Sequence, residues 1–138
     1  MQTIFESEGN VLIITIPGEL TDLNKFINSQ RTNRYAGAKL KKENTEKCCY
    51  AFLMAKAAGL RVTTPINLKI TWYCKNKRKD KDNVAFGIKF ILDGMIEARV
   101  IANDGWGEIA NFEHRFEVDK DCPRIEIELE EENVISRK

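Results

Sequence analysis

The pattern of apolar and polar positions predicts several β-strands. Residues 11–16 read VLIITI, a β-branched apolar run followed by a Pro-Gly turn signal, and this pattern is typical of a buried strand. Residues 66–73, INLKITWY, alternate between apolar and polar side chains, which predicts a strand buried on one face. The same alternation recurs at residues 112–118 and 125–129. We expect these last two segments to form an antiparallel pair with an acidic outer face.

Helical spacing predicts two main helices. Residues 38–58 are rich in Lys, Glu and Ala, their apolar residues fit one helical face, and a glycine follows as a stop. The second helix is expected to have Asp82 at its N-cap and to continue through residues 83–98. Its apolar side holds Val84, Ile88, Ile91, Leu92 and Met95. Its opposite side carries Asp82, Lys89 and Asp93, so this polar stripe is free to line a site at the start of the helix.

Residues 19–39 show no sustained period and predict a long ordered loop. This segment carries side chains that could meet phosphates and stack on bases, namely Lys25, Arg31, Arg34, Tyr35 and Lys39. A solvated connector is the alternative interpretation for each of them. The predicted order is strand, loop, helix, strand, helix, strand, strand. It indicates a single α+β domain over residues 1–138, with a small mixed or antiparallel sheet and two main helices packed on it.

Composition narrows the class of protein. A chain of 138 residues with 43% apolar and 31% charged content is long enough for one domain with a real core. Its formal net charge is only +1, so any attraction to nucleic acid has to come from local clusters of basic residues. The first residues carry no export signal and no apolar run reaches membrane-spanning length, so we expect a cytoplasmic protein without a membrane partner.

The cysteines and the single histidine are expected to have structural roles rather than to form a zinc site. The cysteines are Cys48, Cys49, Cys74 and Cys122. They show no CxxC or zinc-finger spacing, so we expect buried or incidental thiols in a reducing compartment rather than a zinc site with His114. His114 is in phase with Phe112 and Phe116, as expected of a core or interface residue. Trp106, in a Gly-Trp-Gly turn, is a candidate contact for DNA or a partner chain.

Residues 75–104 carry the candidate chemistry. Basic side chains that could bind DNA phosphates surround two aspartates; these are Lys75, Lys77, Arg78, Lys79 and Lys81. We expect Asp80, Asp82 and Asp104 to bind Mg²⁺ or Mn²⁺, because these ions prefer carboxylate oxygens and Asp104 can return to the pair by the length of the intervening helix. Lys89, about two turns along the same face as Asp82, is the expected electrostatic catalyst. The alternative is a solvated loop that ends in a helix cap.

Three segments together resemble the RusA family of Holliday-junction resolvases, which is common in prophages. They are KDKDN at residues 79–83, KFILDG at 89–94 and VIAND at 100–104, and the resemblance covers roughly residues 72–116. It implies a homodimer that binds four-way DNA junctions in recombination and repair and nicks two strands symmetrically with Mg²⁺ or Mn²⁺. The family's metal-binding positions match Asp80, Asp82 and Asp104, and Asn83 and Asp93 lie in the same motifs.

The chain departs from the family pattern in three places. The family's usual pair of acidic residues at the third site is Asn103-Asp104 here, which leaves Asp104 as the ligand. The family's catalytic lysine follows the second aspartate by four residues, where this chain has Phe86, and Lys89 lies one helical turn further on. Aromatic residues precede the acidic motif in some members, where this chain has Arg78 and Lys79. Two alternatives to the resolvase prediction are a non-catalytic phage DNA-binding or regulatory module and a related nuclease that acts on other branched DNA.

Overall fold

The structure is a computed structural model that describes residues 5–8 and 11–131. The strands are β1 (Phe5–Glu8), β2 (Val11–Pro17), β3 (Ile66–Cys74), β4 (Ile109–Val118) and β5 (Arg124–Glu131). The helices are α1 (Leu23–Thr32), α2 (Arg34–Ala57), α3 (Lys81–Ala85) and α4 (Ile88–Glu97). The α+β class is therefore confirmed, as are the strands predicted from alternation and the long helix predicted for residues 38–58.

The strands form one mixed sheet in the order β1-β2-β5-β3-β4. β3 and β4 are parallel, and every other neighbouring pair is antiparallel. The expected β4–β5 pair is wrong, because β3 lies between these two strands. Alternation shows which residues share a face but not which strand is the neighbour. The helical crossover through α3 and α4 lets β4 return parallel to β3, whereas a tight turn would have made an antiparallel pair.

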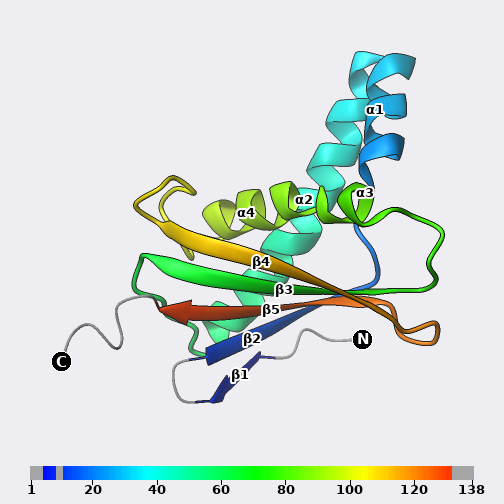
Figure 1. Ribbon diagram of the computed structural model, residues 1–138. Coiled ribbons are helices and arrows are strands. Elements are labelled where there is room, and N and C mark those ends of the chain that lie inside the picture. The colour runs from blue at the N-terminus through cyan, green and yellow to red at the C-terminus, as the bar shows by residue number, and fades with distance from the viewer. Residues whose placement is uncertain (1–4, 9–10, 132–138) are drawn as a thin grey trace.

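One face of the sheet holds the core. Ile70 of β3 is in register with Ile127 of β5 and His114 of β4, and rows of apolar side chains extend from this line in both directions. The fully buried members include Ile14, Ile16, Leu68, Ile70, Ile125, Ile127 and Leu129. α2 and α4 cover this face, and the long α2 crosses most of the sheet (Figure 1). The opposite face carries polar residues, among them Glu126 and Glu128 of β5.

The expected loop over residues 19–39 is wrong, because this segment forms α1 and the start of α2. Each helix has a side-chain cap at its first turn. The Lys25 N–H donates to Asp22 Oδ1 at 2.8 Å, and the Ala36 N–H donates to Asn33 Oδ1 at 2.7 Å. α1 is short and has no fully buried residue, so its apolar residues Leu23, Phe26 and Ile27 give only one turn of helical spacing.

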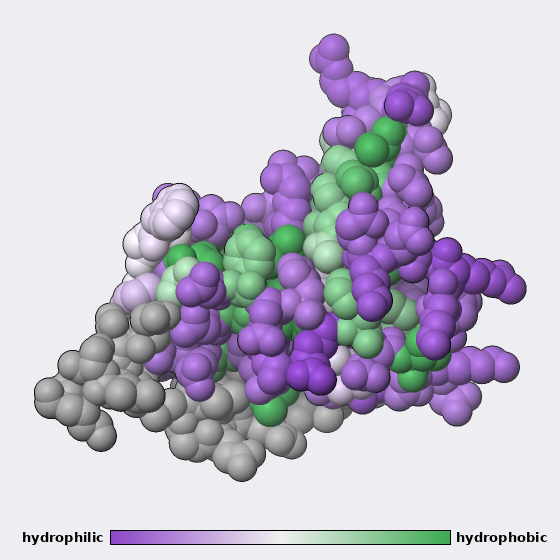
Figure 2. All heavy atoms as spheres, viewed as in Figure 1, coloured by the Kyte–Doolittle hydropathy of each residue, from purple (hydrophilic) through white to green (hydrophobic). Residues whose placement is uncertain are grey.

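Residues 23–42, which comprise α1 and the first part of α2, form a unit that we call the helical hairpin. Its two helices run side by side and extend together beyond the sheet (Figure 1). The hairpin contains Lys25, Arg31, Arg34, Lys39, Lys41 and Lys42 and no Asp or Glu. All of these basic residues are exposed. The near-neutral chain therefore concentrates positive charge on one projection, and Figure 2 shows hydrophilic residues gathered at its end.

The single helix expected after Asp82 is divided into α3 and α4, and its N-cap is Asp80 rather than Asp82. The division falls at Phe86 and Gly87, where the Phe90 N–H bonds to the Gly87 carbonyl three residues back. A Cβ on Gly87 would lie 3.0 Å from the Trp72 ring, so a glycine is needed for this close approach to the sheet. This packing, which no local pattern encodes, places the break.

Candidate active site

The loop between β3 and α3 borders an open depression in the surface. Its lining includes Lys77, Lys79, Asp80, Lys81 and Asp82 from the loop and α3, and Phe116, Glu117 and Val118 from the end of β4. We call it the β3–α3 depression. Asp80 and Asp82, predicted as metal ligands two residues apart, thus lie on one surface with lysines beside them. The parallel pairing of β3 with β4 creates this surface by ending both strands at the same edge.

The two aspartates leave carboxylate oxygens open to solvent. Asp80 has the extended backbone of an N-cap residue, but its side chain makes no capping bond. In the described part of the chain, the Asp80 carboxylate has no hydrogen bond or ion pair. Asp82 accepts one hydrogen bond at Oδ1, from the Asn83 N–H at 2.9 Å. Both residues are exposed. Such a pair suits Mg²⁺, which binds one or two carboxylates and keeps several water ligands.

Lys81 lies beside this pair and contacts Phe116 of β4. Its ammonium lies 5.7 Å from the centroid of the Phe116 ring, within the range of a cation–π interaction. Since Phe116 also lines the β3–α3 depression, this contact keeps a positive charge at its wall. Lys89 is exposed on α4, beyond the break at Gly87, and does not line the depression.

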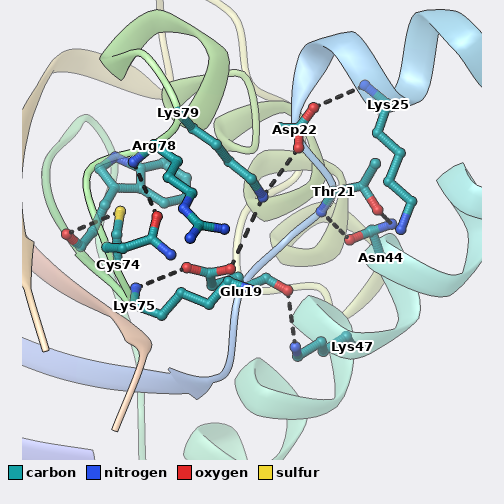
Figure 3. Close-up of polar contacts among 12 residues, drawn as sticks. Glu19, Thr21, Asp22, Lys25, Asn44, Lys47, Cys74, Lys75, Arg78 and Lys79 are labelled. Atoms are coloured by element: carbon teal, nitrogen blue, oxygen red, sulfur yellow. Dashed lines mark hydrogen bonds and ion pairs between the residues drawn. The ribbon is translucent and has the colours of Figure 1, made fainter. Parts of the chain in front are cut away.

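Lys79 is held by carboxylates of the chain itself, which the sequence interpretation missed. Its ammonium lies 3.0 Å from Asp22 Oδ2 and 4.0 Å from Glu19 Oε1 (Figure 3). Glu19 also accepts a 3.0 Å bond at Oε2 from the Lys75 backbone N–H. Burial alone would raise the pKa of Asp22, but the Lys25 N–H bond and the Lys79 ammonium hold that pKa below its usual value. Lys79 therefore anchors the loop to the segment before α1.

The remaining basic loop residues keep exposed side chains. Lys75, Lys77 and Arg78 are all exposed. The Arg78 backbone N–H donates to Asn76 Oδ1 at 3.0 Å, a turn bond that sets the local chain direction (Figure 3). Because the backbone is fixed by Glu19 and Asn76, these side chains are presented on an ordered loop beside the aspartates.

Asn83 connects the site to the helical hairpin. Its Oδ1 accepts a 2.9 Å hydrogen bond from the Asn24 N–H in the first turn of α1. Phe26 of α1 packs on Phe86 just behind α3, with ring centroids 5.4 Å apart. These contacts fix the base of the hairpin against α3. The basic hairpin, which includes Arg31 and Arg34, therefore starts next to Asp80 and Asp82 and projects away from them (Figure 1).

Asp104 is not brought to Asp80 and Asp82 within one chain. It precedes β4, whereas Asp80 follows β3, and parallel strands put these positions at opposite ends of the sheet (Figure 1). The nine residues of β3 separate the two ends by roughly 30 Å. Across residues 5–8 and 11–131, no three Asp, Glu, His or Cys side chains are grouped so that they could hold a metal ion.

Asp93 lies outside the β3–α3 depression. It faces Lys41, Lys42 and Glu46 of α2 across a separate shallow hollow. The next residue, Gly94, is buried, and a Cβ there would lie 2.6 Å from Cys48 Cβ, so the glycine lets α4 and α2 cross closely. Gly94 of this segment is therefore explained by helix packing. Cys48 belongs to the core, and burial raises the pKa of its thiol to about 12.

In the part of the chain that the structure describes, none of the helices combines the length and apolar character that crossing a membrane requires.

No protein-family model matches the chain, and no curated protein matches it either.

Proposed function

We propose that the protein is a metal-dependent endonuclease that binds four-way DNA junctions as a homodimer and resolves them by paired symmetric nicks. The observation that carries this proposal is the position of Asp80 and Asp82 beside Lys77 and Lys81, at the base of a projecting basic hairpin. Phosphodiester cleavage needs carboxylates for a metal ion and positive charge for the phosphate, and this edge of the sheet supplies both.

Asp80 and Asp82 are the proposed metal ligands. Their exposed oxygens fit Mg²⁺ or Mn²⁺, and Asp104 does not add to them within one chain. A bound ion of this kind lowers the pKa of a coordinated water and offsets charge on the attacked phosphate. Lys81 lies on the same surface, so its ammonium is placed to bind a phosphate oxygen of the strand that is cut.

The distribution of charge supports one DNA-binding face. The hairpin and the β3–α3 loop present their cations on the side of α3, whereas the uncovered face of the sheet carries more carboxylates than cations, with Glu113, Glu117, Glu126 and Glu128 beside Lys69 and Arg115. DNA phosphates are attracted to the first surface and repelled by the second. A hairpin that extends from the cleavage site suits branched DNA, because Arg31 and Arg34 at its end would contact a duplex arm away from the scissile bond.

The resemblance of residues 79–83, 89–94 and 100–104 to RusA resolvases is the second support. It selects junctions from the wider class of branched DNA. A homodimer fits this substrate, because two active sites related by a twofold axis meet two strands of similar symmetry.

A non-catalytic DNA-binding module is the second candidate. One observation favours it, since the described residues contain no cluster of three acidic, histidine or cysteine side chains. Under this proposal the basic hairpin and loop bind DNA, while Asp80 serves only as the N-cap residue of α3.

The deciding experiment incubates the protein with a labelled four-way junction or a matched linear duplex, with Mg²⁺, Mn²⁺ or EDTA. We expect paired nicks in the junction alone, lost with EDTA and in Asp82→Asn, while the variant still binds the junction. Asp93→Asn is the matched control and should cut normally, because Asp93 lies outside the depression. Binding without cleavage in either metal would establish the non-catalytic module, and cleavage of flaps in preference to junctions would move the substrate to other branched DNA.

A further inference from the structure

β4 is a long strand at an edge of the sheet. It has ten residues and contains neither Pro nor Gly, and within residues 5–8 and 11–131 its one partner strand is β3. Its one irregularity lies near its start, where the register with β3 shifts between Ile66 and Asn67, and the pairing is regular from Asn111 to Val118. An edge strand presents a row of unpaired backbone donors and acceptors, and proteins normally protect such edges with Pro, bulges or short strands. The regular part of β4 has none of these three protections, although it carries charged side chains at Glu113, Arg115 and Glu117, which also discourage unmatched pairing.

The side chains of β4 are also incompletely covered. Phe112, His114 and Phe116 continue the apolar rows of Leu68, Ile70 and Trp72 on the helix-covered face. The β3 members of these rows are at most 3% exposed, whereas Phe112 is 50% exposed. The helix layer therefore leaves the outermost row partly open. The opposite face of β4 carries Glu113, Arg115 and Glu117, whose charges alternate along the strand.

We propose that β4 pairs antiparallel with β4 of a second copy of this chain, with His114 opposite His114 of the partner subunit at the twofold axis. This register places Glu113 opposite the partner's Arg115, and symmetry repeats that ion pair. It places Phe112 opposite the partner's Phe116 in the same way. Cross-strand pairs of opposite charge and of aromatic rings both stabilise a sheet, and each pair here occurs twice.

The charges select this register among those that keep each side chain on its own face. An axis at Arg115 would oppose Arg115 to itself and Glu113 to the partner's Glu117, so every charged pair would be repulsive. An axis at Glu113 would oppose Glu113 to itself. An axis at Phe116 would pair Arg115 with the partner's Glu117, but it would oppose Glu113 to the partner's Asp119.

The length of the pairing separates the His114 register from the Phe116 register. The His114 register pairs the strands from Ala110 to Val118, whereas the Phe116 register uses β4 only from His114 to Val118. The longer overlap makes more backbone hydrogen bonds and covers Phe112. This arrangement specifies the surface of the homodimer in the proposed function, but association through β4 does not depend on catalysis.

The test is sedimentation velocity of the full chain over a range of concentrations. We expect a dimer, and Arg115→Glu or Glu113→Arg alone should raise its dissociation constant by roughly ten- to thirtyfold, because each variant creates two repulsive pairs across the interface. Glu113→Arg also opposes Lys69 of β3 within each chain, so Arg115→Glu is the cleaner of the two single variants. The double variant Glu113→Arg/Arg115→Glu exchanges the two charges and should restore the dimer to within about threefold of the original. Restoration also shows that the single variants had not failed to fold.

Glu117→Arg distinguishes the registers. In the His114 register Glu117 faces the partner's Asn111, so this variant should dimerise normally, whereas the Phe116 register predicts that it dissociates. A chain that stays monomeric at all concentrations, or single reversals that leave the dimer unchanged, would overturn the proposal. All measurements can be repeated with Asp82→Asn in the background, so a failure of association is separate from a failure of cleavage.

Discussion

The indole N–H of Trp72 donates a 2.9 Å hydrogen bond to Nδ1 of His114. The two rings also stack, with centroids 6.0 Å apart and an angle of 16° between their planes. This bond joins β3 to the edge strand β4 through side chains, and it requires an unprotonated Nδ1. His114 is thus half-buried at the boundary between the core and the open edge of the described sheet.

Lowering the pH should destabilise the fold through His114. Burial holds the pKa of His114 below its ordinary value of 6.5, so between that value and the folded-state pKa the unfolded chain binds a proton that the folded chain does not. The free energy of unfolding should be independent of this group above pH 6.5 and should fall as the pH drops below 6.5. Urea unfolding at several pH values between pH 5 and pH 8 measures this change in the free energy of unfolding.

The chain has a single histidine, which makes the control simple. His114→Phe keeps an aromatic residue in the row of Phe112 and Phe116 but cannot titrate. It should lose the decline in stability just below pH 6.5, while the part due to carboxylates at lower pH remains. An unchanged pH profile in this variant would show that another group is responsible.

Removing either proposed ligand should weaken metal binding directly. We expect Asp80→Asn or Asp82→Asn to lower the affinity for Mn²⁺ by on the order of tenfold or more, because Asp80 and Asp82 are the neighbouring carboxylates of the β3–α3 depression, and its other carboxylate, Glu117, lies on β4. Electron paramagnetic resonance of free Mn²⁺ measures this without any cleavage. Asp93→Asn, on the far side of α4, should bind Mn²⁺ like the unmodified protein. Equal affinities in all three variants would contradict the metal site.

Two lysines can be compared as electrostatic catalysts. Lys81 lies beside Asp80 and Asp82 over Phe116, whereas Lys89 lies beyond the break in the helix. Lys81→Ala should therefore slow junction cleavage by roughly ten- to a hundredfold, and Lys89→Ala should change it by less than about threefold. Single-turnover rates with saturating protein separate this effect from DNA binding. The opposite ranking would restore the assignment of Lys89 that helical spacing predicts.

Local patterns predict the elements that bury a continuous apolar face. The alternation of residues 66–73 and the spacing within residues 38–58 both reflect contact with one core, and both elements form as expected. α1 escapes this reasoning because it buries no whole side chain, and its signal lies in the capping residues Asp22 and Asn33. Such caps are visible in the sequence, but only when a helix is sought between them.

The candidate site likewise combines a contact that follows from the local sequence with contacts that depend on the whole fold. Asp80 and Asp82 are neighbours in the chain, so their proximity follows from the local sequence. The distance to Asp104 depends instead on β4 lying parallel to β3, which is a property of the whole sheet. Likewise, Lys79 pairs with Asp22, a residue from a distant segment, and no pattern within residues 75–82 indicates that its charge is already neutralised.

Arg31 and Arg34 give the sharpest test of the helical hairpin. Both are exposed at the junction of α1 and α2, away from Asp80 and Asp82, so they should bind a DNA arm without taking part in cleavage. Replacing both with Ala should weaken junction binding and lower the slope of log affinity against log salt by about two, because two phosphate contacts are lost. Fluorescence anisotropy in the Asp82→Asn background measures both quantities.

Lys69 supplies the matched control for this experiment. It is a basic residue on the uncovered face of the sheet, in register with Glu113 and Glu128. Lys69→Ala removes a positive charge, as the hairpin variants do, but from the surface that should not meet DNA. The slope of log affinity against log salt should therefore stay the same. If Lys69→Ala reduced the slope as much as the hairpin variants, DNA would be held by the overall charge of the protein. If only the hairpin variants reduced it, binding would be confined to the face that carries the hairpin and the β3–α3 loop.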